Sequence, residues 1–204
     1  MKAGAETSTR QAAPEGEVLS QAFFARDTVE VARQLLGKLL VREVDGERRW
    51  GRLVEVEAYL GPDDECAHSY RGRRSPRNEV MYGTAGHAYV YFTYGMHHCL
   101  NFVTRDPGVP QAVLVRALEP GPGVGRCSGP GLVCRALEVD RALNGVMLEP
   151  PVLYVVDDGE PERRIYVTPR VGVGTGDWAG KPLRFCWDSP HLSRPIPRAL
   201  RAVD

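Results

Sequence analysis

Glycine and proline recur along the whole chain, and their spread limits what the chain can fold into. There are 22 Gly and 16 Pro among 204 residues. Glycine weakens a helix and proline ends one, so we expect short helices and many loops. The runs between them alternate apolar and polar residues, which is the pattern of strands. We therefore predict an α+β fold: a single compact domain with a mixed, mostly antiparallel curved β-sheet, surrounding helices and a projecting β-hairpin.

Local signals locate the individual elements. Asp27-Thr-Val-Glu30 resembles a capping box and predicts a short amphipathic helix that ends near Gly37. Residues 39–44 and 50–59, joined by the Asp45-Gly46 turn, predict a β-hairpin. The other predicted elements are a helix at 132–137, preceded by a cap at Ser128 and an N1 proline at Pro130, and strands at 111–118, 152–156, 164–168 and 183–187.

The N-terminal residues and the cysteines indicate where in the cell the protein works. Residues 1–18 are polar and lack the apolar core of a signal peptide, so we expect a flexible leader followed by one domain over residues 19–204. No stretch approaches the roughly 18 apolar residues of a membrane span. The cysteine count of 5 is odd, and no C-x-x-C pair occurs. These features predict a cytoplasmic protein with reduced thiols, which does not contact a membrane.

Charge says little about partners until its distribution is considered. Lys and Arg number 26 and Asp and Glu number 26, so net charge does not predict nucleic-acid binding. Lysine occurs only at Lys2, Lys38 and Lys181, so nearly all the positive charge is arginine. The planar guanidinium group suits bidentate contact with phosphate, which favours a nucleic-acid partner weakly.

The strand predicted at residues 52–60 carries two acids on one face. Alternate side chains of a strand share a face, so Glu55, Glu57 and Tyr59 lie together, opposite an apolar face. Acids on a solvated strand face are ordinary, and the strand alone favours that interpretation. A histidine and a burst of arginines follow closely, however: His68, Arg71, Arg73, Arg74 and Arg77. A carboxylate that activates water, beside arginines that hold phosphates, suits hydrolysis on a nucleic acid.

A second predicted hairpin, residues 87–94 and 99–103, is rich in tyrosine. Tyr89, Tyr91 and Thr93 share one face, and Tyr94 stands at the turn. Tyrosines in strands are most often core residues. A tyrosine at a glycine-containing tip is costly to leave without a partner, whereas an enzyme that extrudes a base needs a wedge and aromatic walls.

Six segments together carry a resemblance to a known family. They are V-E-V-E-A-Y-L-G-P-D-D-E-C-A-H-S, S-P-R-N, Y-V-Y-F-T-Y-G-M-H-H-C-L-N, V-L-V-R-A-L-E-P, C-S-G-P and P-R-V-G-V-G-T-G-D-W-A-G-K-P-L-R-F. In this order, and over roughly residues 35–187, the chain closely resembles the alkyladenine (3-methyladenine) DNA glycosylase family.

The resemblance implies roles for particular residues. The family's general base falls on Glu57, and the arginine that helps to hold the attacking water and a nearby phosphate falls on Arg116. The residues implied to line the base pocket are Tyr59, His68, Tyr91 and Asn101, the last discouraging normal guanine. Tyr94 matches the residue that intercalates into DNA, and contacts with the DNA backbone are implied for Arg73, Arg77 and Met96.

The implied activity is base excision repair. Such an enzyme flips alkylated or deaminated purines out of duplex DNA and hydrolyses the N-glycosidic bond: 3-methyladenine, 7-methylguanine, hypoxanthine or ethenoadenine. A cationic purine is a good leaving group, so one carboxylate suffices, and we interpret Glu55 as structural. None of the three lysines lies in the acidic strand or the aromatic hairpin, which argues against a Schiff-base lyase step. We expect a bacterial, nucleoid-associated monomer without a cofactor.

Other hypotheses fit some of the same residues. Cys66-Ala-His68 and His97-His-Cys99 contain zinc-ligand types without the usual paired spacing, so we expect no metal. The glycines of Gly172-x-Gly174-x-Gly176 lack the lysine of a phosphate-binding loop and are better explained by a tight turn. Two rival functions remain: a damaged-DNA binding protein without catalysis, and a hydrolase of free nucleosides. The second would need neither a projecting Tyr94 nor an arginine cluster.

Overall fold

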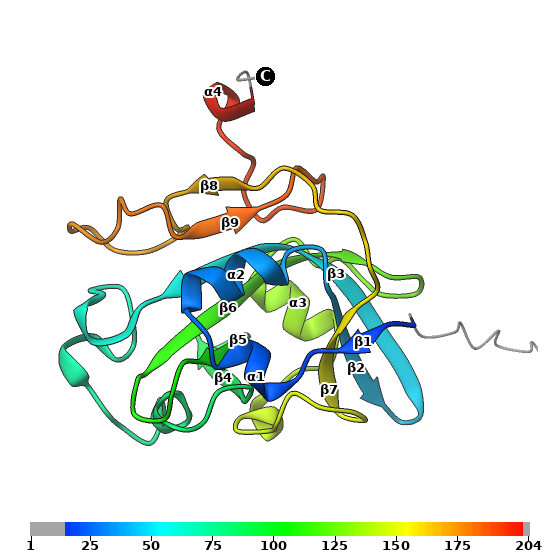
Figure 1. Ribbon diagram of the computed structural model, residues 1–204, viewed down its shortest axis with the longest axis horizontal. Coiled ribbons are helices and arrows are strands. Elements are labelled where there is room, and N and C mark those ends of the chain that lie inside the picture. The colour runs from blue at the N-terminus through cyan, green and yellow to red at the C-terminus, as the bar shows by residue number, and fades with distance from the viewer. Residues whose placement is uncertain (1–14, 202–204) are drawn as a thin grey trace, which may run out of the picture.

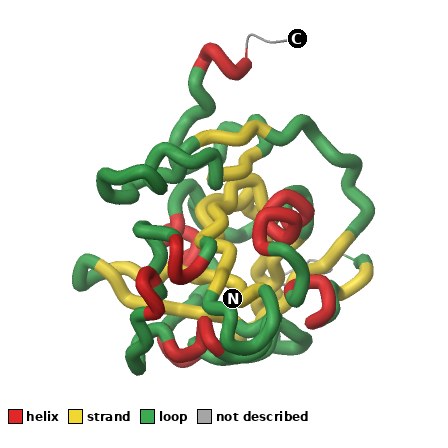
Figure 2. Tube along the Cα trace, turned by 60° about the vertical axis from the view of Figure 1, so that its left-hand side comes forward, coloured by secondary structure: helices red, strands yellow, loops and turns green. Residues whose placement is uncertain are grey.

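The computed structural model describes residues 15–201. Of the predicted leader, residues 1–14 lie outside the described residues. Its last two residues, Glu17–Val18, form strand β1, which pairs with a later strand of the sheet. Figure 2 shows how much of the chain is loop, with the strands crossing its middle.

The described chain folds around a nine-stranded sheet. After β1, its strands are β2 Leu39–Val44, β3 Glu47–Tyr59, β4 Ala88–Thr93, β5 His97–Thr104, β6 Gln111–Pro120, β7 Leu153–Asp157, β8 Tyr166–Thr168 and β9 Arg184–Cys186. Seven of them follow the order β1-β7-β2-β3-β6-β5-β4, and β9 joins β3 and β8. Every strand pairing in the described part of the chain is antiparallel, so the predicted α+β fold with a mostly antiparallel sheet is confirmed.

Short helices cover the sheet, as the glycine and proline content predicts. They are α1 Gln21–Phe24, α2 Thr28–Leu35, α3 Pro130–Ala136 and α4 Arg198–Arg201. Single 3₁₀ turns occur at Gly61–Asp63, Tyr70–Gly72, Glu79–Tyr82 and Arg141–Leu143. Among the described residues, no helix has the length and apolar character needed to cross a membrane.

Two predicted helix starts have different outcomes. Asp27 caps α2, because its carboxylate accepts the backbone N–H groups of Val29 and Glu30 at 2.9 and 3.2 Å. Helix α3 begins at Pro130, the predicted N1 proline. The predicted cap at Ser128 is wrong: Gly129 occupies the N-cap position and no side chain caps the helix. Gly129 has a φ of 150°, which favours glycine, and it stands at the helix start one residue after the serine.

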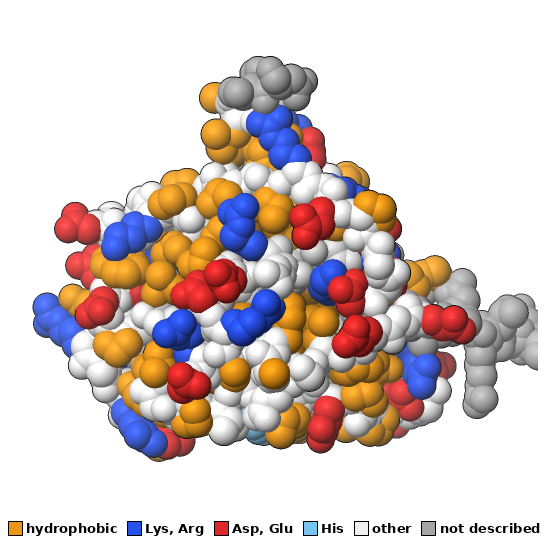
Figure 3. Space-filling model, viewed as in Figure 1, with side chains coloured by type: hydrophobic (Ala, Val, Ile, Leu, Met, Phe, Trp, Pro, Cys, Tyr) orange, Lys and Arg blue, Asp and Glu red, His pale blue; other side chains and the backbone are white. Residues whose placement is uncertain are grey.

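The main core lies between the sheet and helices α2 and α3. Val31 and Leu35 of α2 and Val133 of α3 are fully buried in one cluster with Val56 of β3 and Phe102 of β5. In Figure 1, the β8–β9 hairpin lies above this body and α4 projects beyond it. Figure 3 shows basic and acidic side chains interspersed over the face in view, in keeping with the balanced net charge.

Strand β3 is the strand on which the site depends, because three strands pair with it. Its first half pairs with β2, its second half pairs with β9 at residues 55–57, and β6 pairs along its other edge. The register with β6 shifts between Leu53 and Val56, which marks a bulge. Glu55 and Glu57 are 0% exposed. The interpretation of this face as an ordinary solvated one is therefore wrong, because β9 and the segments around it cover the acids.

A packing constraint at the end of α2 yields a stability test. Gly37 and Gly46 both have positive φ, 87° and 77°, which strains any other residue. A Cβ at Gly37 would lie 2.1 Å from the buried ring of Trp187, whereas a Cβ at Gly46 would meet nothing within 4 Å. We expect Gly46→Ala to lower the free energy of unfolding by about 1 kcal/mol. Gly37→Ala should lower it by about 3 kcal/mol, because overpacking is added to the same backbone strain.

Urea denaturation of both variants and the parent measures the difference. Equal losses at the two glycines would show that Trp187 does not hold this corner of the fold.

Candidate active site

A pocket of about 490 Å³ opens beside the second half of β3. Strands β3 to β6 and the loop at residues 171–174 contribute to its wall. The four residues implied as pocket residues all line it: Tyr59, His68, Tyr91 and Asn101. The structure thus brings together side chains from four separate segments of the chain. Its volume lies within the usual range of small-molecule sites.

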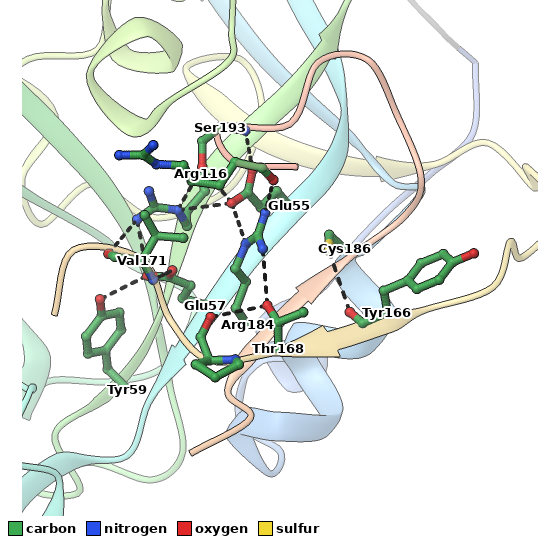
Figure 4. A network of polar contacts seen from close by, with 12 residues as sticks. Glu55, Glu57, Tyr59, Arg116, Tyr166, Thr168, Val171, Arg184, Cys186 and Ser193 are labelled. Carbon is green, nitrogen blue, oxygen red and sulfur yellow. Dashed lines mark hydrogen bonds and ion pairs between the residues drawn. The ribbon is translucent and has the colours of Figure 1, made fainter. Parts of the chain in front are cut away.

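Glu57 lies directly behind this pocket. Its Oε1 accepts the backbone N–H of Val171 at 2.7 Å. Its Oε2 accepts the hydroxyl of Tyr59 at 3.0 Å and Nη1 of Arg116 at 3.3 Å. These three residues line the pocket, so Glu57 is in contact with the pocket wall. Figure 4 shows the three contacts. A carboxylate has about four acceptor positions, so three donors leave one for a further partner.

Glu55 is held mainly by groups away from the pocket. Its Oε1 accepts Nε of Arg116 at 3.2 Å, Nε of Arg184 at 2.7 Å and the hydroxyl of Ser193 at 2.6 Å, and its Oε2 accepts the backbone N–H of Ser193 at 2.6 Å. Of these partners, Arg184 and Ser193 do not line the pocket. This geometry favours the structural interpretation of Glu55, and it distinguishes two acids that the strand pattern alone could not separate.

The environment makes Glu57 a stronger base than an ordinary carboxylate. Burial raises the pKa of the Glu57 carboxyl, and the negative charge of Glu55 adds to the rise. The positive charge of Arg116, the N–H of Val171 and the hydroxyl of Tyr59 oppose it. The pKa stays above its usual value, so Glu57 takes up a proton at a higher pH than an ordinary carboxylate does.

The aromatic side chains of the pocket wall are uncharged, and the charged residues that line it are Arg116 and Glu65. Burial, assisted by the charges of Arg77 and Arg73, lowers the pKa of His68 to about 4, so its ring is neutral near neutral pH. Its Nδ1 lies 2.8 Å from the hydroxyl of Tyr89, which holds the ring in place. The His68 ring meets the ring of Tyr91 edge to face, at 4.6 Å between centroids. Burial also raises the pKa of Tyr91, so it remains a neutral phenol.

Arg170 supports the opposite wall. Its guanidinium lies 4.5 Å from the ring centroid of Tyr59 and contacts Asp64 at 2.5 and 2.8 Å. It also donates to the carbonyl of Ala58 at 3.0 Å, and both charged side chains are 0% exposed. The next residue supplies the N–H that Glu57 accepts. Arg170 therefore orders both the Tyr59 ring and the start of the 171–174 loop.

The tip of the β4–β5 hairpin projects from the molecule. Tyr94 is 84% exposed and Met96 is 68% exposed. Tyr94 and Gly95 both have positive φ, 52° and 67°, as in the tight turns of twisted hairpins. A non-glycine residue in this conformation costs about 1–2 kcal/mol. The turn conformation favours glycine or asparagine, so the stability of the fold does not explain a tyrosine at this position.

The implied DNA-contacting arginines lie near the pocket. Arg73 and Arg77 are exposed, and the charges of both reach His68. The guanidinium of Arg77 lies 5.4 Å from the ring centroid of Tyr91. The backbone carbonyl of Arg73 accepts Nδ2 of Asn78 at 2.8 Å, which holds the loop while the side chain stays exposed. By contrast, the donors of Arg116 face the two glutamates.

The rival ligand hypotheses gain little from the geometry. Within residues 15–201, no three His, Cys, Asp or Glu side chains are grouped as metal ligands would be. Gly172 and Gly176 have positive φ, 71° and 137°, as a turn requires. The turn is also part of the pocket, since Gly172 and Gly174 line it.

Sequence reasoning missed four contributors: the Val171 N–H, Arg170, Arg184 and Ser193. The first three lie within the segment P-R-V-G-V-G-T-G-D-W-A-G-K-P-L-R-F. That segment was used only as part of the family resemblance, although its residues also hold the two acids. Ser193 had no signal, because nothing in its neighbourhood indicates that it meets β3.

Comparison with known proteins agrees with this geometry. The family model described as methylpurine-DNA glycosylase matches residues 22–190. The chain is 43% identical over 201 residues to a protein of Desulfitobacterium hafniense, covering 86% of this chain and 98% of the relative. It is 49% identical over 188 residues to one of Anaeromyxobacter dehalogenans, covering 90% and 89%. Each relative bears the name "Putative 3-methyladenine DNA glycosylase".

A third relative bears the same name: a protein of Myxococcus xanthus is 48% identical over 190 residues, covering 90% of this chain and 97% of its own. The chain therefore belongs to the methylpurine-DNA glycosylase family and is a DNA repair glycosylase, a hydrolase of the N-glycosyl bonds of DNA.

Proposed function

We propose that this glycosylase flips a damaged purine out of duplex DNA and hydrolyses its N-glycosidic bond with water activated by Glu57. The observation that carries the proposal is the contrast between the two buried acids. All three donors to Glu57 line the pocket, whereas Arg184 and Ser193, which supply three of the four donors to Glu55, do not. The proposed substrates are 3-methyladenine, 7-methylguanine, hypoxanthine and ethenoadenine, and the enzyme acts as a monomer on DNA.

The chemistry requires one base. Glu57 accepts a proton from water, the water oxygen bonds to C1′ of the sugar, and the C1′–N bond breaks with its electrons on the purine. A cationic purine such as 3-methyladenine or 7-methylguanine leaves as a neutral base and needs no protonation, whereas neutral hypoxanthine or ethenoadenine takes up a proton from solvent water as it leaves. Arg116 balances the charge of Glu57 while the sugar develops positive charge. The product is an abasic site. The ammonium of Lys181 lies 3.1 Å from the Trp178 ring centroid and does not line the pocket, which supports a monofunctional enzyme.

The pocket favours electron-poor purines. Tyr59, Tyr91 and neutral His68 present ring faces and edges, and a cationic base is attracted to aromatic faces. Asn101 is 4% exposed and donates to the carbonyl of Tyr89 at 3.0 Å, so its position is fixed. A fixed amide at this wall supports its proposed role of crowding the exocyclic amine of normal guanine.

The surroundings of the pocket suit duplex DNA. Tyr94 also lines the pocket mouth, where it can fill the space that a flipped base leaves. Arg73 and Arg77 provide exposed positive charge beside it for phosphates. A hydrolase of free nucleosides needs neither feature.

Removing the base tests the mechanism. We expect Glu57→Gln to lower single-turnover release of hypoxanthine or ethenoadenine from end-labelled duplex by about 100-fold or more, because amide cannot deprotonate water. Alkali then cleaves the abasic sites that form. Glu47→Gln, at the exposed start of the same strand, is the matched control and should behave as the parent. Full activity of Glu57→Gln would overturn the mechanism. A parent that binds lesion duplex tightly but releases no base, from these or from methylated DNA, would favour the non-catalytic binder.

The pKa of Glu57 predicts the pH dependence of the parent and of Tyr59→Phe. The base works ionised, so the rate falls as pH drops through a pKa that burial holds above 4.5. Tyr59 stabilises the ionised form, and removing its hydroxyl should move the acid limb upward by about one pH unit. Single-turnover rates across the acid range measure this shift. A limb that stays in place would show that the Tyr59 hydroxyl does not act on the titrating group.

The wedge is tested at the hairpin tip. We expect Tyr94→Gly to relieve the backbone strain, leave the fold stable and lower excision from duplex about tenfold, because an aromatic ring no longer stacks in the vacated space. Excision from a single-stranded lesion should change little, and Tyr94→Trp should retain duplex activity. Equal duplex rates for Tyr94→Gly and the parent would refute the assignment.

A further inference from the structure

The chain beyond β9 returns to the acid strand. Residues 189–196 begin at Ser189, 7% exposed, and end at Ile196, 3% exposed. Between these two buried residues, Ser193 donates hydrogen bonds to Glu55 (Figure 4). The family model ends at residue 190, so Ser193 lies beyond the part of the chain that it matches. The segment also joins β9 directly, because the carbonyl of Arg194 accepts Nη2 of Arg184.

Ser193 supplies two of the four donors to Glu55. Its backbone N–H meets Oε2 and its hydroxyl meets Oε1, both at 2.6 Å. The same hydroxyl oxygen accepts Nε of Arg116 at 3.2 Å. Ser193 therefore touches both partners of one ion pair. It does not contact Glu57 or line the pocket, so any effect on the reaction passes through other residues.

We propose that Ser193 is a positioning residue of the reaction: by holding Glu55 it directs the guanidinium of Arg116 onto Glu57. This inference rests on the proposed role of Glu57 as the base. Arg116 is shared almost equally, with Nε 3.2 Å from Glu55 and Nη1 3.3 Å from Glu57. Such a balance changes when one carboxylate loses another donor.

The direction of the change follows from the contacts. Without the hydroxyl, Oε1 of Glu55 loses one of its three donors, and Nε of Arg116 loses one of its two acceptors and keeps Oε1 of Glu55. Glu55 then draws Arg116 toward itself and away from Glu57. Glu57 is left with less neutralising charge and binds a proton more readily. Arg184 still donates to Glu55 at 2.7 Å, so the buried acid stays paired and the fold persists.

The other groups that face Glu57 do not provide this link. On β3 they are Glu55, a like charge, and Tyr59, a donor. From β4 the charge of Glu57 reaches only the neutral Tyr91, and the 171–174 loop adds the Val171 N–H. Arg184 of β9 is in register with Glu57, yet its Nε contacts Glu55. Among the described ion pairs, the cation paired with Glu57 is Arg116.

The experiment compares Ser193→Ala, Ser193→Thr and the control His191→Ala in the full chain. Single-turnover excision of hypoxanthine from duplex is measured from mildly acidic to mildly alkaline pH, together with lesion-duplex affinity and the melting temperature. Ser193→Ala should be about tenfold slower than the parent at acidic pH, corresponding to a rise of about one unit in the pKa of Glu57. Its rate should approach the parent's at alkaline pH, with unchanged affinity. Ser193→Thr, which keeps the hydroxyl, should restore the profile, and His191→Ala should match the parent.

Two results would overturn the inference. One is a parental pH profile for Ser193→Ala. The other is a loss of the same factor at every pH, with a lower melting temperature, which a merely structural residue would give. Glu57→Gln assayed alongside separates the two claims: if it remains active, the proposed function fails, whereas an inactive Glu57→Gln beside a parental Ser193→Ala removes only the role of Ser193.

Discussion

Two carboxylates buried side by side on one strand are the constraint around which this protein is arranged. Glu55 and Glu57 are both inaccessible, and an unpaired buried ion costs several kcal/mol. Cations reach them from both edges of β3: Arg116 from β6 and Arg184 from β9. Beside β3, β9 takes the place of β2 near the bulge between Leu53 and Val56. This change of partner strand brings the second cation, Arg184, to the acids. The strand pairing that forms the sheet therefore also brings the cations that neutralise the two acids.

That balance offsets the charge of Arg116, which lines the pocket. With two carboxylates matched by two guanidinium groups, the charge of this cluster sums to zero. The rings of the wall are phenols whose pKa values are raised by burial and His68, whose pKa is lowered to about 4. A cationic purine therefore meets ring faces rather than repulsion. The exposed positive charge of Arg73 and Arg77 stands outside, where phosphates are the natural partners.

Prediction from sequence succeeded where information is local. Alternation and turn chemistry located both hairpins, the α2 helix and the tip at Tyr94, because side-chain period and positive φ depend on neighbours in the chain. The strand pattern also placed Glu55 and Glu57 on one face. It could not show what covers that face, since the cover arrives from β9 and from Ser193, more than a hundred residues later. Burial, and with it the change from a solvated face to a charge cluster, is a property of tertiary packing.

The same limit explains why two similar acids could be told apart only in three dimensions. In sequence, Glu55 and Glu57 have equivalent neighbours and equivalent faces. In the fold, Glu55 is held by Arg184 and Ser193, which do not line the pocket, whereas the donors to Glu57 all line it. A carboxylate held away from a cavity stabilises structure, whereas one in contact with the cavity wall is placed to accept a proton there. The resemblance to a family implies that Glu57 is the base, and the position of its donors gives a physical reason to propose that residue rather than its neighbour two positions away.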